Sequence, residues 1–349
     1  MFYIFFLSYF NKHYYCWRGV STTDSVHLTL LLVFNNQYNK KMSHGEEDKE
    51  NSVVVEKVGG RSSITSCLSR YPIKFISPKK VGPSNIDAVW VYILNYGGGI
   101  VSGDHISCKF SVGDACTMVL TTQGSTKVYK SVGSKCSHQI LEARVGSNAL
   151  LAIIPDPVTC FSTARYYQKQ VFTVSSDSNL VIVDWITSGR HESGEKWDFD
   201  LYRSTNNIFF DDGQPLFLDT MLLEKDSFGR VKEHMLDYQV IAMIVLLGPK
   251  MQFIQNLVQD NVKRIMTEQL QNPSAALSHQ KSKADFFMTK PSLVASCSVF
   301  GPKVSYKLVS ELLFLFLTYF VYYLELVVSV GLPCNDSEFA PFTLSIYER

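Results

Sequence analysis

The sequence lacks the cysteine spacing on which zinc sites and disulfide-stapled domains depend. Its 8 cysteines are scattered along 349 residues, and no two of them form a C-x-x-C pair. The spacing therefore indicates neither a zinc site nor a disulfide framework, and isolated buried thiols are the expected state.

An excess of charge of either sign is also missing. The 33 Lys and Arg residues nearly balance the 32 Asp and Glu residues, which gives a formal net charge of +1. No basic stripe is present, so binding to nucleic acid has no electrostatic basis. Hydrophobic residues make up 46% of the chain, which is enough to bury the core of one large or two ordinary domains.

Complete signatures of nucleotide and zinc-protease sites are absent as well. The glycine run 97–99 lacks the G-K-[ST] ending of a phosphate loop, and the Gly-Ser-Thr-Lys stretch at 124–127 lacks the upstream glycine. His191-Glu192 begins like the zinc-binding pattern H-E-x-x-H, but Glu195 stands where the second histidine is needed.

One enzymatic alternative stays open in the polar stretch 184–200. His191 would have to activate Ser188 or Ser193 as the nucleophile of a serine hydrolase. Neither serine lies in the G-x-S-x-G turn of the best-known hydrolases. The plainer interpretation is a polar loop between two strands that ion pairs of Arg190 hold in place.

The N-terminal region differs from the rest of the chain. Residues 1–10 are apolar and aromatic, but no basic region precedes them and no small-residue cleavage site follows, so a secretory signal is poorly supported. Met42 opens a charged stretch, MSHGEEDKENS, which is typical of a solvated start. We therefore expect a poorly ordered extension over 1–69, with Met42 as an alternative start.

Residues 311–330, ELLFLFLTYFVYYLELVVSV, form a long apolar stretch near the other end. A membrane span needs about 20 such residues, and Glu325 interrupts this run towards one end. A buried helix or strand pair, a segment foreign to the fold, and a membrane-tethered interaction protein are the three interpretations.

The body between these ends is rich in short strands. Residues 106–112 alternate between apolar and polar side chains, and Gly113-Asp114 then predicts a hairpin to a second strand over 115–122. Apolar residues at helical spacing over 254–270 predict an amphipathic helix. The expected fold class is mainly β, with layered or sandwich-like antiparallel sheets and one or two helices towards the C-terminus.

Six strings in this body together resemble the urease accessory protein D family in its plant form. They are GGGIVSGD, LTTQGSTKVYKS, PDPVTCFSTARYYQKQ, DWITSGRHESGEKWDFDLY, DDGQPLFLDTMLLE and ASCSVFGPK. The resemblance runs over residues 70–303 with the strings in the family's order, so it is highly specific. The matched motif residues are Gly98, Gly99, Gly103, Thr121, Thr122, Lys127, Tyr129, Pro155, Pro157, Arg165, Trp185, Ser188, Gly189, Arg190, Gly194 and Trp197.

The resemblance implies a chaperone of urease maturation rather than an enzyme. It implies apo-urease and urease accessory proteins F and G as partners, with protein G supplying the GTPase. It also implies transient nickel(II) in a water-filled internal passage, no tightly bound cofactor, a cytoplasmic location, and no nucleic-acid or membrane partner.

The sequence offers carboxylates beside predicted turns for such a nickel passage. Hard oxygen ligands exchange faster than Cys and His cages, so they suit an ion that must move on. Asp104 and Glu195 are the first choices, followed by Asp156, Asp184 and Asp200.

The chain departs from the family's pattern after Lys303. Residues 304–349 contain the apolar run and a tail that match no element of the family, as translated intron would. The expected organisation is therefore the extension 1–69, a β-rich domain over 70–303 and an atypical C-terminal segment over 304–349.

Overall fold

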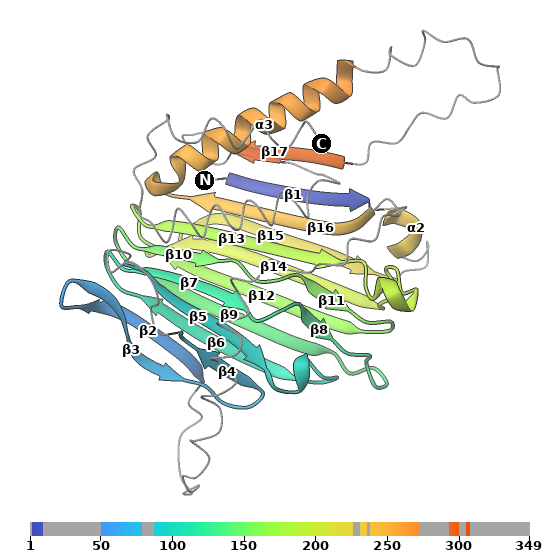
Figure 1. The fold of residues 1–349 in the computed structure, drawn as a ribbon, viewed down its shortest axis with the longest axis horizontal. Coiled ribbons are helices and arrows are strands. Elements are labelled where there is room, and N and C mark those ends of the chain that lie inside the picture. The colour runs from blue at the N-terminus through green and yellow to red at the C-terminus, as the bar shows by residue number, and fades with distance from the viewer. Residues whose placement is uncertain are drawn as a thin grey trace, which may run out of the picture. The chain divides into compact units, whose positions relative to one another are not determined.

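The computed structural model describes residues 2–9, 50–78, 87–225, 231–235, 238–271, 293–299 and 305–307. Within these ranges the chain is mainly β, with two layered sheets and a long helix, α3 (Gln252–Gln271), near the C-terminal end (Figure 1). The predicted fold class is confirmed in these respects.

Each sheet has a defined strand order. Sheet A runs β18 (Ser305–Lys307), β17 (Leu293–Val299), β1 (Phe2–Tyr9), β16 (Tyr238–Leu247), β13 (Asn179–Thr187), β10 (Leu150–Ile153), β7 (Thr117–Thr122), β5 (Val89–Asn95), β4 (Ile73–Ile76), with β11 (Val158–Cys160) and β8 (Thr126–Val128) attached beside β13. Sheet B runs β15 (Pro215–Glu224), β14 (Leu201–Phe210), β12 (Arg165–Val174), β9 (Ser137–Val145), β6 (His105–Val112), β2 (Asn51–Val58), β3 (Arg61–Leu68).

The middle of the chain winds back and forth between the two sheets. Strands β5, β7, β10 and β13 belong to sheet A, and the next strands of sheet B along the chain are β6, β9, β12 and β14. The short strands β8 and β11 lie within two of the return connections and belong to sheet A. Because the long strands alternate between the sheets, neighbours such as β6 and β9 run parallel. One apolar core fills the space between the sheets, with Phe110, Met118 and Phe172 among its members.

This winding gives the two sheets two unlike ends. At the short-turn end, residues 113–116, 146–149 and 175–178 connect a strand of sheet B to the next strand of sheet A. At the long-loop end, the return connections are residues 96–104, 123–136, 154–164 and 188–200.

Two predictions about strand pairing are wrong. The Gly113-Asp114 turn does not close a hairpin, because β6 lies in sheet B and β7 lies in sheet A. The sheets are mixed rather than antiparallel: β10 pairs in parallel with both β7 and β13, whereas β14 and β15 form an antiparallel hairpin. Period-two alternation shows which side chains face the core, but a turn that crosses between sheets satisfies that pattern equally well.

The expectation of poor order over 1–69 also requires correction. Residues 51–58 and 61–68 form β2 and β3, and β2 pairs in parallel with β6 in sheet B. Residues 2–9 form β1, which pairs antiparallel with both β16 and β17. Alternating apolar residues such as Val53 and Val55, both fully buried, explain why this segment joins the core.

Helix α3 confirms the helix predicted from the spacing of apolar residues. Its buried face carries Ile254, Val258 and Val262, and Gln255 Nε2 donates a hydrogen bond of 3.2 Å to Leu246 O of β16. Within the described ranges, no helix combines the length and the apolar character that a membrane span needs. The apolar stretch 311–330 lies outside the described residues.

Candidate functional site: a polar pocket between the sheets

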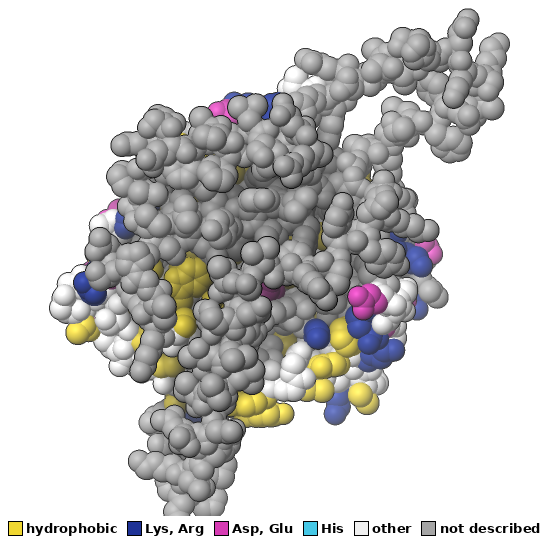
Figure 2. Space-filling view, viewed as in Figure 1, with side chains coloured by type: hydrophobic (Ala, Val, Ile, Leu, Met, Phe, Trp, Pro, Cys, Tyr) yellow, Lys and Arg dark blue, Asp and Glu magenta, His cyan; other side chains and the backbone are white. Residues whose placement is uncertain are grey.

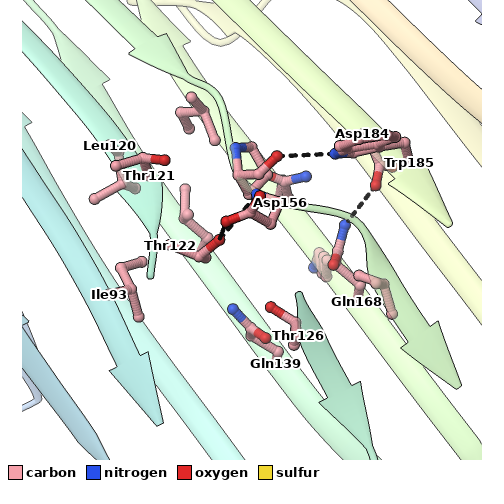
Figure 3. Close-up of a pocket in the computed structure, with 16 residues that line it drawn as sticks. Ile93, Leu120, Thr121, Thr122, Thr126, Gln139, Asp156, Gln168, Asp184 and Trp185 are labelled. Atoms are coloured by element: carbon pink, nitrogen blue, oxygen red, sulfur yellow. Dashed lines mark hydrogen bonds between the residues drawn. The ribbon is translucent and has the colours of Figure 1, made fainter. Parts of the chain in front are cut away.

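A small cavity of about 50 Å³ lies between the two sheets. Sheet A contributes strands β5, β7, β10 and β13 to its lining, and sheet B contributes β9 and β12 (Figure 3). This volume has room for a few water molecules and no organic ligand. The pocket is unusual for a sandwich core because acidic and amide side chains share its wall with Leu and Ile.

Asp184 is the most deeply buried acid of the pocket, with 3% of its surface exposed. It lies in β13 of sheet A and is held by sheet B. Its Oδ1 accepts a hydrogen bond of 2.9 Å from Gln168 Nε2, drawn in Figure 3. Its Oδ2 accepts bonds of 2.5 Å from Ser204 Oγ and 2.8 Å from Asn206 Nδ2.

No salt bridge within the described residues includes Asp184. Burial raises the pKa of its carboxyl group, and the hydrogen bonds from Ser204, Asn206 and Gln168 oppose that rise without cancelling it. A buried anion without a cation is unfavourable, so burial favours the protonated form of Asp184.

The amide network continues beyond Asp184 towards β9. Tyr166 is fully buried, and its hydroxyl donates a bond of 2.8 Å to Gln139 Oε1 and lies 3.3 Å from Gln168 Oε1. Asn206 is 1% exposed, and its Oδ1 finds no hydrogen-bond partner within the described part of the chain. Because buried acceptors are nearly always satisfied, water or a transient ligand is the natural partner of this oxygen.

Asp156 is the second acid of the pocket and follows β10. Its Oδ2 accepts a hydrogen bond of 3.2 Å from Thr122 Oγ1. Its backbone N–H donates a hydrogen bond of 2.8 Å to Thr122 Oγ1. Trp185 Nε1 donates 2.8 Å to Pro155 O and so anchors the segment, as Figure 3 shows. Burial raises the pKa of Asp156, and the Thr122 bond opposes the rise.

The other three carboxylates predicted for a passage do not line this pocket. Glu195 forms two hydrogen bonds with Arg190, Nε to Oε2 at 3.0 Å and Nη2 to Oε1 at 2.5 Å, and this partner lowers its pKa. Asp104 accepts 2.8 Å from Val101 N within its own turn. Asp200 lies at the end of the loop 188–200, where its N–H donates 3.0 Å to Ala164 O. The structure thus brings together Asp156 and Asp184 only.

The matched motif residues gather around the pocket and at the long-loop end beside it. Thr121, Thr122, Pro155 and Trp185 line the pocket. Pro157 accepts 3.0 Å from Thr126 N at the start of β8. The remaining motif residues, Gly98, Gly99, Gly103, Lys127, Tyr129, Arg165, Ser188, Gly189, Arg190, Gly194 and Trp197, lie in or next to the four long connections.

A close contact between two of these connections explains Gly99. A Cβ on Gly99 would lie 2.5 Å from Lys127 O and 2.8 Å from Tyr129 Cε2. Ile100 N donates 2.8 Å to Lys127 O, and Tyr129 N donates 2.9 Å to Ile100 O, so the two loops are bonded directly. Only glycine permits this approach.

The structure excludes one of the two candidate nucleophiles of the serine-hydrolase alternative. Ser188 is fully buried, and its Oγ donates 2.6 Å to Gln239 Oε1. A nucleophile without access to solvent cannot meet a substrate, so Ser188 is excluded from this role. Trp197, in the same loop, is 1% exposed and donates 2.6 Å from Nε1 to Tyr238 O.

Sequence reasoning missed the neutral residues that line the pocket, Gln139 and Gln168, and those that bond to Asp184, Ser204 and Asn206. Gln139, Gln168, Ser204 and Asn206 sit on strands at positions that face the core. Polar residues at inward positions of alternating strands were the available signal. Within the described residues, no group of three or more His, Cys, Asp or Glu is placed to hold a metal; the pocket instead offers two carboxylates with amide and hydroxyl oxygens.

The described residues thus form a layered β protein with a polar internal pocket and glycine-rich loops. The chain matches the family model described as UreD urease accessory protein over residues 48–303, and it belongs to that family. The matched range includes residues 48–69, which the sequence analysis had placed in the extension.

Relatives from plants and bacteria are similar over this range. Urease accessory protein D of Arabidopsis thaliana is 63% identical over 253 residues, which cover 72% of this chain and 86% of that protein. Urease accessory protein D of Oryza sativa subsp. indica is 55% identical over 251 residues, covering 72% and 82%. Urease accessory protein UreD of Sorangium cellulosum is 38% identical over 198 residues, covering 57% and 61%. These relatives are named as accessory proteins, not as enzymes, in agreement with the prediction for this chain.

Proposed function

We propose that this chain assists the maturation of urease by binding apo-urease, together with urease accessory proteins F and G, and by passing nickel(II) towards the urease active site. It performs this role in the cytoplasm and catalyses no reaction of its own. Nickel is its cargo, held transiently and without a resident cofactor.

The observation that carries the nickel step is Asp184, a buried carboxylate that no described cation neutralises. A divalent ion next to Asp184 and Asp156 would relieve the cost of burying negative charge. Amide and hydroxyl oxygens of Gln168 and Thr122, which line the same pocket, complete a set of hard ligands that bind and release water and ions quickly.

Weak binding follows from the same composition. Among the described residues that line the pocket, none offers the soft sulfur or imidazole ligand that would trap a transition metal. Because burial raises the pKa of both acids, protons compete with nickel for them, and acidification should empty the pocket before it affects ordinary surface carboxylates.

Reconstitution tests the proposal. The full chain is combined with apo-urease, proteins F and G, GTP and nickel, and urease activity is measured against mixtures that omit this chain. We expect activation only in the complete mixture, with the chain recovered in a complex with apo-urease. Equal activation without the chain would contradict the proposal.

A further inference from the structure

Exposed hydrophobic side chains gather on the loops of the long-loop end. Tyr71 is 78% exposed, Tyr96 42%, Val101 48% and Val132 71%. The rings of Tyr71 and Tyr96 stack with centroids 5.9 Å apart. Tyrosine at a solvent boundary is typical of interfaces, because its ring buries apolar area while its hydroxyl keeps a polar partner.

Three lysines, Lys127, Lys130 and Lys135, are exposed on the same loops. The carboxylate within these loops, Asp104, is bonded to Val101 N at 2.8 Å. In the adjoining loop, Arg190 and Glu195 form an ion pair. The exposed carboxylates of that loop are Glu192 and Asp198, of which Asp198 accepts a hydrogen bond of 2.7 Å from Ser162 Oγ. Figure 2 shows Lys or Arg side chains beside hydrophobic ones at the lower right, over the loop end of the sheets in Figure 1. We call the four hydrophobic residues and three lysines the loop-end patch.

Hydrogen bonds between loops fix the backbone that carries the loop-end patch. Tyr96 N donates 2.9 Å to Pro72 O, and Tyr129 Oη donates 3.1 Å to Gly97 O. Val132 N donates 2.9 Å to Ser102 Oγ. A surface built in advance loses less conformational entropy on binding than a flexible one.

We propose that the loop-end patch is a docking surface for a protein partner with an acidic contact face. The apolar side chains supply the buried centre of the interface, and the lysines around them attract and orient the acidic partner. The inference rests on the proposed function only for the choice of probes, which are apo-urease, protein F and protein G.

Two variants of the full chain test this proposal by titration against each probe at low and high salt. Replacing Lys127, Lys130 and Lys135 with Glu is expected to weaken binding to at least one probe by about tenfold or more at low salt, and by less at high salt, because salt screens exposed charges. Tyr96→Ala is expected to weaken the same binding by about tenfold at both salt concentrations.

A matched control reverses the charge at three exposed positions outside the loop-end patch, by replacing Arg61, Arg144 and Arg203 with Glu. It is expected to leave binding within about twofold, and unchanged thermal unfolding midpoints show that all variants are folded. If the unaltered chain binds a probe and the patch variants bind it equally well, the docking surface is disproved while the proposed function stands. If the unaltered chain binds none of the probes, both fail.

Discussion

At both ends of the sheets, connections link a strand of one sheet to a strand of the other, but their lengths differ greatly. At the short-turn end, each connection needs few residues and bonds to its neighbour, as Ala115 N does to Ser147 O at 2.8 Å and Asn179 N to Ala149 O at 2.8 Å. The long-loop end performs the same return with much longer segments. Four of the family's six strings, the exposed residues Tyr96, Val101 and Val132, and one side of the polar pocket lie in or next to these longer segments.

This difference in length indicates where function is located in this fold. The ladder of parallel strands and the short turns provide a stiff frame, and the long connections carry most of the loop-end patch, which we propose binds a protein partner. The long connections are nevertheless ordered by packing and hydrogen bonds, so they are not free to move independently of the frame. Each of the following substitutions tests this contrast.

Trp197→Ala should have the largest effect. This side chain belongs to a long connection, is 1% exposed, and bonds to Tyr238 O of β16 at 2.6 Å. Its loss leaves a cavity and removes the hydrogen bond to Tyr238 O, so we expect stability to fall by about 3–5 kcal/mol. Urea unfolding monitored by far-ultraviolet circular dichroism measures this loss of stability. A loss below about 1 kcal/mol would mean that the long connections do not stabilise the frame.

Gly99→Ala and Gly113→Ala compare the two ends directly. A Cβ would lie 2.5 Å from Lys127 O at Gly99 but 3.1 Å from Val55 O at Gly113. We expect Gly99→Ala to lower stability by about 1–3 kcal/mol and Gly113→Ala by less than about 1 kcal/mol. The same unfolding assay checks this ranking, and equal losses at the two positions would refute it.

Asp184→Asn should change how stability depends on pH. Because burial raises the folded-state pKa of Asp184 above its ordinary value of 3.8, its favourable contribution is complete below that value and is lost as pH rises through the raised pKa. The variant, which has no charge at this position, should lose less stability over this window. Parallel stability curves for the two proteins between acid and neutral pH would contradict the assignment.

Val58→Ala should have the smallest effect. Val58 ends β2 beside the short-turn end and is 54% exposed, so we expect a change within about 0.5 kcal/mol and no loss of partner binding. Weaker binding of apo-urease or of proteins F and G to this variant would show that docking is not confined to the long-loop end.

The sequence was informative where side-chain periodicity alone decides the structure. Alternation in β6 and the apolar spacing of α3 were both readable. It was not informative about which strands pair, because a turn between sheets and a hairpin bury the same residues. Order in β2 and β3 was missed because the charged stretch before them outweighed their own alternation.

Only the two acids of the pocket could be predicted from the sequence, for a related reason. Asp184 stands out as one acid in the otherwise apolar and buried strand NLVIVDWIT, and Asp156 is marked by its two flanking prolines. The partners of Asp184, however, come from β12 and β14 of the opposite sheet. Contacts of that kind depend on the register between layers, which no local pattern encodes.

Urease activation by the Asp184→Asn variant tests the central claim most directly. The measurement compares it with the unaltered chain and with Glu142→Gln, an exposed carboxylate of sheet B, at limiting nickel and with equal amounts of assembled complex. We predict that Asp184→Asn lowers activation by about tenfold or more, because the buried charge that favours the ion is gone, while Glu142→Gln has no effect. Full activation by Asp184→Asn, with the complex intact, would contradict a role of the pocket in nickel transfer.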